Sequence, residues 1–62
     1  MMKQIVEQLS DLAITYFYEA YAYELAAAAE EDTGKAARLK EFADKMDSVA
    51  NSLLKIVEEI EE

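Results

Sequence analysis

The chain has 62 residues, 53% of them hydrophobic, and a formal net charge of −8 at neutral pH. It has no cysteine and no histidine, which excludes disulfides, thiolate metal sites and histidine-based catalysis. A single domain this small has a marginal core, so we expect a partner chain to complete it. The negative charge disfavours nucleic acid and anionic lipid as partners, and the lack of cysteine fits a cytoplasmic protein.

Residues 2–31 are predicted to form one long helix, because they contain neither glycine nor proline and are rich in alanine, leucine and glutamate. Five aromatic residues lie between positions 16 and 23 and radiate around this helix. Tyr16 and Tyr23 fall on one flank, Tyr21 on the opposite flank and Tyr18 near the polar side. The apolar stripe that repeats every seven residues is Val6, Leu9, Ala13, Tyr16, Ala20, Tyr23 and Ala27. One partner helix covers one stripe, so the remaining rings are expected to meet another chain.

The same helix is not expected to enter a membrane. Residues 12–29 approach the length of a membrane span but carry Glu19 and Glu24, which make insertion unfavourable. The first seven residues, MMKQIVE, place polar and acidic groups where a signal peptide would be basic and apolar. We therefore expect neither a membrane anchor nor a signal peptide.

A turn is predicted at residues 32–35, Asp-Thr-Gly-Lys, which contain the only glycine of the chain. Thr33 is expected to cap the following helix, or Gly34 to close the preceding one in a left-handed conformation. The seven-residue register also breaks between residues 30 and 36. Because a short connection makes neighbouring helices antiparallel, residues 1–62 are predicted to form one all-α domain, an antiparallel helical hairpin.

Residues 35–59 are predicted to form the second helix, with one apolar and one polar face. In the folded hairpin, Phe17 is expected to lie opposite Ala50, and Tyr21 near Met46, so that large residues meet small ones. The predicted stripe of this helix is Leu39, Phe42, Met46, Val49, Leu53, Ile56 and Ile60.

Two such hairpins are expected to form a homodimeric four-helix bundle, because one hairpin cannot cover the wide apolar surface of the first helix. The predicted function is a non-enzymatic assembly or protein-interaction module, a role that suits a natural adaptor or an engineered bundle. Its partner is a second copy, with another protein at the tyrosine-rich helix as a further possibility. The predicted interface residues are Val6, Leu9, Ala13, Tyr16, Phe17, Ala20, Tyr21, Tyr23, Phe42, Met46, Val49 and Leu53.

Glu24 interrupts the apolar arc of the first helix. We expect it to pair with Lys35, Arg38 or a tyrosine hydroxyl, since buried charges are usually paired. Two alternatives are a buried acid that responds to pH and a hard-cation site. In the second case, Glu24 and Glu31 of both chains would converge on the metal. Helical-bundle metal sites typically combine glutamate with a Glu-x-x-His motif, and the chain has no histidine. No cofactor is therefore predicted.

Catalysis is not expected. Ser10, Ser48 and Ser52 have no histidine or cysteine to form a nucleophilic site with. The fragment at residues 33–35, Thr-Gly-Lys, is too short to be a phosphate-binding loop.

RNA binding is an alternative function. Four of the six basic residues lie in the first half of the second helix, and exposed tyrosines can stack on bases. Acidic residues interleave with these cations, which are Lys35, Arg38, Lys40 and Lys45.

The overall plan also resembles the Rop (RNA one modulator) family, in which a helical hairpin of similar length dimerises into a four-helix bundle and clamps paired RNA loops. In the first helix only Lys3-Gln4 is similar to that family. The side beyond this stretch is acidic, so the resemblance implies the bundle and leaves RNA binding as an alternative. That side carries Glu7, Asp11, Thr15 and Tyr18.

Overall fold

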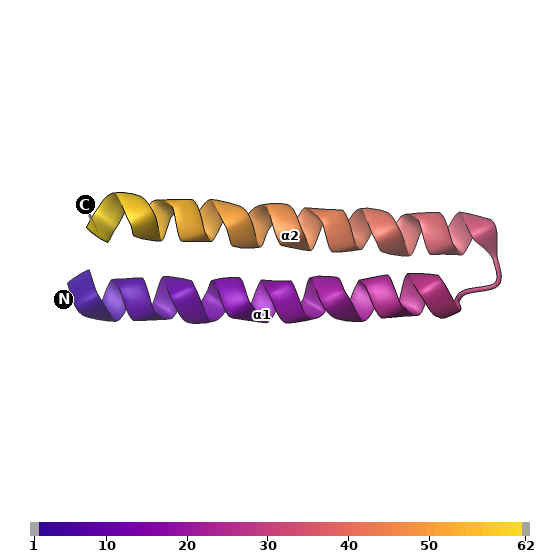
Figure 1. Cartoon of the computed structure of the whole chain (residues 1–62), viewed down its shortest axis with the longest axis horizontal. Coiled ribbons are helices and arrows are strands. Elements are labelled where there is room, and N and C mark those ends of the chain that lie inside the picture. Colours follow the sequence, from indigo (N-terminus) through magenta and orange to yellow (C-terminus); the bar gives the residue numbers. More distant parts are fainter. Residues whose placement is uncertain (1, 62) are drawn as a thin grey trace.

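The chain is an antiparallel hairpin of two helices in a computed structural model that describes residues 2–61 (Figure 1). Helix α1 spans Met2–Ala29, and helix α2 spans Thr33–Glu61. The helices lie side by side along their whole length, with both ends of the chain at the same end of the hairpin. The predicted all-α hairpin is confirmed. Met1 and Glu62, which the predicted domain includes, lie outside the described residues.

The turn is shorter than predicted, and Asp32 rather than Thr33 caps the second helix. The Oδ1 atom of Asp32 accepts a hydrogen bond from the Lys35 N–H at 3.0 Å, which satisfies one of the free donors in the first turn of α2. The Asp32 carbonyl accepts from the Ala36 N–H at 2.9 Å. The Asp32 N–H in turn donates to Oε1 of Glu30 at 3.1 Å.

Gly34 does not close α1. It lies in the first turn of α2, and no residue of the described chain has a positive φ. A Cβ atom at position 34 would lie 3.3 Å from Oδ1 of Asp32, a close contact with the capping carboxylate. Gly34 therefore does not adopt the left-handed backbone predicted as one alternative, and a larger residue there would crowd the capping carboxylate.

Asp32→Ala is expected to destabilise the hairpin by about 1 kcal/mol, because it removes the side-chain acceptor from the start of α2. For a domain of this size the melting temperature should fall by about 4–8 °C. Thermal unfolding followed by circular dichroism measures this. Thr33→Ala is the matched control and should change stability by less than about 0.5 kcal/mol. A larger loss in Thr33→Ala than in Asp32→Ala would contradict the assignment of the cap.

The contact between the helices, called the seam below, uses the predicted stripe of α1. All seven of its residues are buried or half-buried. On α2 the prediction is correct at four positions and wrong at three, since Phe42, Val49 and Ile56 remain 39–46% exposed. The buried or half-buried row of α2 is Leu39, Ala43, Met46, Ala50, Leu53, Val57 and Ile60.

The seam alternates large and small side chains. The most deeply buried residues are alanines, each at most 1% exposed, and no large side chain is fully buried within the described chain. In an antiparallel pair joined at residues 30–32, Ala13 and Ala20 of α1 come level with Ala50 and Ala43 of α2, so the two helices can approach closely there. Tyr21 was predicted to lie near Met46 in this core, but it is 60% exposed. The four alanines are Ala13, Ala20, Ala43 and Ala50.

Candidate interaction surface

One long side of the hairpin carries a row of large apolar side chains, which we call the Phe42 face. Each of its residues directly precedes a residue of the seam, so in an antiparallel pair the rows from both helices lie on the same flank. The face comprises Ile5 (42% exposed), Leu12 (44%), Phe42 (46%), Val49 (39%) and Ile56 (45%). Three of the five, Phe42, Val49 and Ile56, come from α2 and were predicted to lie in the seam. The other two come from α1.

Phe42 is held against α1 by an aromatic contact. Its ring centroid lies 5.6 Å from that of Tyr23, with the ring planes tilted by 33°. The Nζ atom of Lys45 lies 5.8 Å from the Phe42 centroid, within the range of a cation–π interaction. These contacts fix the Phe42 ring on this side of the hairpin while leaving almost half of it accessible.

Beside this cluster is a surface hollow of about 390 Å³, where small side chains leave space between the helices. It is lined by Glu19, Ala22, Tyr23, Ala26 and Leu39. Glu19 occupies the position on α1 that Leu12 occupies one heptad earlier, so a carboxylate borders the Phe42 face. Glu24, and not Glu19, was the carboxylate predicted from the sequence to interrupt the apolar surface of α1. The position of Glu19 could have been predicted from the seven-residue spacing, because this residue follows Ile5 and Leu12 in the same row of α1.

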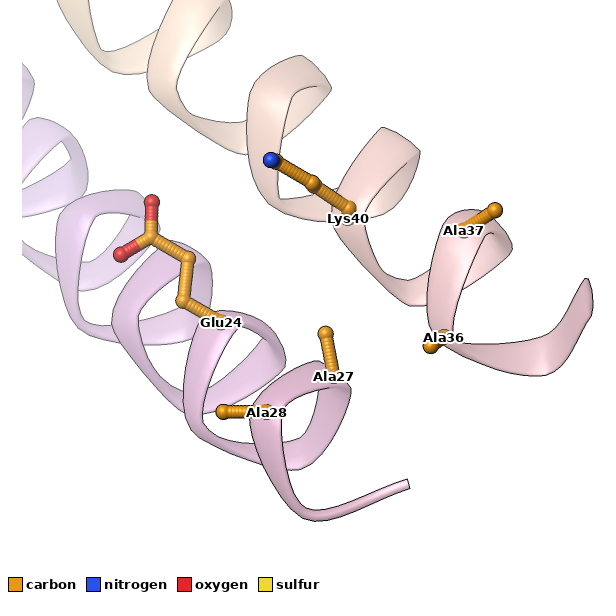
Figure 2. Close-up of a pocket in the computed structure, with 6 residues that line it drawn as sticks. All are labelled: Glu24, Ala27, Ala28, Ala36, Ala37 and Lys40. Carbon is orange, nitrogen blue, oxygen red and sulfur yellow. The ribbon is translucent and has the colours of Figure 1, made fainter. Parts of the chain in front are cut away.

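The opposite flank of the hairpin carries Glu24 (Figure 2). Glu24 is exposed, so its predicted place in a buried arc is wrong. Figure 2 shows its carboxylate and the Lys40 side chain on the same side of the two helices. They border a second hollow of about 390 Å³, whose other lining residues are Ala27, Ala28, Ala36 and Ala37.

The four clustered cations do not share one face. Lys40 lies on the Glu24 flank and Lys45 lies over the Phe42 ring. Lys35 and Arg38 line a separate hollow at the turn, together with Glu30 and Leu39. Lys35 and Arg38, the predicted partners of Glu24, therefore lie in a different hollow from it.

The candidate metal ligands Glu24 and Glu31 are both exposed, seven residues apart and two turns along the helix axis. Between residues 2 and 61, no three or more acidic side chains come together in a way that could hold a metal ion.

Nine of the twelve predicted interface residues lie at or beside the seam, where they are buried or half-buried. The other three, Tyr21, Phe42 and Val49, are exposed and available to a further chain. The other three residues of the Phe42 face, Ile5, Leu12 and Ile56, are not among the predicted interface residues.

Neither helix, over the part of the chain that is described, has the length and hydropathy that crossing a bilayer requires. The sequence matches no protein-family model, and comparisons with curated proteins and with solved structures find no match either. The likeness to the Rop family therefore concerns the hairpin plan alone, and the function must be inferred from the geometry of this chain.

Proposed function

We propose that this chain is a self-assembling helical module, in which two hairpins bury their Phe42 faces against each other as a four-helix bundle. The observation that carries the proposal is the Phe42 face itself. Five large apolar side chains, each 39–46% exposed, are aligned on one flank of both helices. In four-helix bundles, such a third apolar row beside the two seam rows faces the remaining helices.

The total surface of the hairpin supports this proposal. Its accessible surface is 4898 Å² for a mass of 7.0 kDa. A compact monomer of this mass is expected to expose roughly 4,000 Å². The excess is close to the roughly 800 Å² that each partner buries in an interface of standard size. One copy therefore leaves exposed about as much extra surface as a dimer would cover.

The shape of the hairpin points the same way. Its Cα atoms extend over 47 × 14 × 10 Å, with a radius of gyration of 14.3 Å. A compact domain of this length would have a radius of gyration of about 11 Å. The broad side, with an outline of roughly 650 Å² before side chains are added, is large enough for a standard interface.

Composition distinguishes the two broad sides. The Phe42 face presents five large apolar side chains. The Glu24 flank presents the charged groups of Glu24 and Lys40 over a hollow lined by alanines. Glu19 and Lys45 border the Phe42 face, but its five large exposed apolar side chains make it the side whose burial releases more free energy, so it is the side that a second copy should cover.

The solution mass tests the proposal. Light scattering across a concentration series near neutral pH should give twice the chain mass of 7.0 kDa. The melting temperature should also rise with protein concentration, because association stabilises the folded state by mass action. A mass of one chain at every concentration, with a constant melting temperature, would overturn the proposal.

A further inference from the structure

Helix α1 carries a second apolar row on the side that faces away from α2, which we call the outer strip. Its residues are spaced by four, three and four positions, the spacing of one face of a helix that packs against another helix. They are also among the most exposed large side chains of the described chain. The outer strip comprises Ile14 (51% exposed), Tyr18 (72%), Tyr21 (60%) and Leu25 (54%).

Neither the seam nor the Phe42 face uses the outer strip. At about 100° per residue, the strip lies roughly 120° around α1 from the row that contains Ala13 and Ala20. Leu12, which belongs to the Phe42 face, is two residues from Ile14 and therefore points roughly 160° away from it. The outer strip thus stays exposed in the hairpin and in the proposed dimer.

A second copy is a poor occupant for the outer strip, because the strip has acidic residues in line with it at its N-terminal end. Glu7 and Asp11 continue the row toward the N-terminus of α1. Two outer strips packed together would place these carboxylates near one another, which is unfavourable.

Helix α2 of another copy does not offer a matching surface either. Its outward side consists of charged and polar residues and has no apolar row. These residues are Glu41, Asp44, Ser48, Asn51 and Lys55, all exposed.

Charge complementarity identifies the kind of partner. After Lys3, helix α1 has no basic residue, and all of its remaining charged side chains are acidic. Lysine and arginine can bind these carboxylates, and their cations can lie over the exposed rings of Tyr18 and Tyr21. We propose that the outer strip is a docking site for a basic amphipathic helix of a different protein. Its apolar residues would pack along the strip and its lysines and arginines would meet Glu7 and Asp11.

The proposal does not depend on the homodimer, since the two surfaces are separate. If both hold, one assembly presents two docking strips, one on each α1. The protein would then act as an acidic adaptor that brings two basic helices together.

A designed peptide pair provides the test. The basic peptide is an amphipathic helix of about 20 residues, long enough to span the strip, with leucine on one face and lysine and arginine beside it. Its matched control has glutamate in place of every basic residue. Anisotropy of the labelled peptides, titrated with the full chain at about 0.15 M salt, measures affinity. We expect the basic peptide to bind with a dissociation constant in the micromolar range, one per chain, and the acidic peptide not to bind.

Two variants locate the site. The double variant Tyr18→Ser, Tyr21→Ser keeps every charge and should weaken binding at least tenfold, because it removes the aromatic anchors alone. Leu12→Glu, on the Phe42 face, should leave the affinity per chain unchanged. Circular dichroism verifies that both variants remain helical. Shifts of amide resonances in the unmodified chain, confined to α1 around residues 14–25, would locate the site without any substitution.

The proposal is overturned if the basic peptide does not bind, if the acidic peptide binds equally well, or if the double tyrosine variant binds as tightly as the original chain. Loss of binding in Leu12→Glu alone would assign the peptide to the Phe42 face and also overturn it. These outcomes are independent of the mass measured without peptide, so failure of the docking site and failure of the dimer can be told apart.

Discussion

Leu12→Glu is expected to convert the dimer into a monomer. Leu12 is 44% exposed in the hairpin and belongs to the Phe42 face, which the proposed dimer buries. The substitution adds two carboxylates per dimer to a surface that would exclude water, and two apolar side chains are lost from it. Unfavourable burial of this kind costs several kcal/mol, so the dissociation constant should rise at least about 100-fold. Light scattering at matched concentrations measures the change.

Ile14→Glu is the matched control for this experiment. Ile14 lies on the same helix, is 51% exposed, and acquires the same charge, but it belongs to the outer strip. The solution mass of the Ile14→Glu variant should therefore remain that of the dimer. If both variants become monomers, added charge rather than the position of Leu12 is responsible. If neither does, the Phe42 face is not the interface.

Ala50→Leu is expected to destabilise the hairpin more than any single change on its surface. Ala50 is fully buried in the seam, where its small side chain lets the two helices approach closely. Adding three carbon atoms there forces the helices apart or the side chains out of their preferred rotamers, which costs about 1–3 kcal/mol. A core of this size rarely supplies more than about 3–5 kcal/mol, so a large share of the stability would be lost. Urea unfolding, with the original chain and the variant at the same protein concentration, measures the difference.

The control is Ala37→Leu, on the same helix. Ala37 is exposed and lies outside the seam, so its substitution should change the unfolding free energy by less than about 0.5 kcal/mol. Equal losses at positions 37 and 50 would contradict the close approach of the helices at Ala50. A gain in stability at position 50 would mean that the seam has room for a larger residue.

The sequence predicted α1 more accurately than the row by which α2 meets it. In α1, every seventh position of the stripe is alanine or a large apolar residue, and neighbouring rows contain charged residues that mark their exposure. In α2, by contrast, the row of Phe42, Val49 and Ile56 and the row of Ala43, Ala50 and Val57 are adjacent, and both are apolar. The prediction assigned the larger side chains, Phe42, Val49 and Ile56, to the seam because they are more hydrophobic. The structure instead buries the neighbouring row.

The functional surfaces were harder to predict than the helices. The excess of aromatic residues in α1 correctly indicated that one partner helix cannot cover them all, and Tyr18, predicted near the polar side, is 72% exposed. The outer strip was missed because Ile14 and Leu25 were not connected with Tyr18 and Tyr21. Its spacing resembles that of the seam, so exposure in the folded hairpin was needed to tell the two rows apart.

The sequence by itself determined two helices, a turn near residue 32 and an antiparallel arrangement. These features follow from local preferences: strong helix formers throughout, a single glycine that interrupts them, and a connection too short for any other path. Only the tertiary structure decided which apolar row of α2 lies in the seam. That choice depends on volume, because the buried alanines of both helices let the two backbones approach closely, and Phe42 or Val49 in their places would force the helices apart. The large residues excluded from the seam then form the Phe42 face.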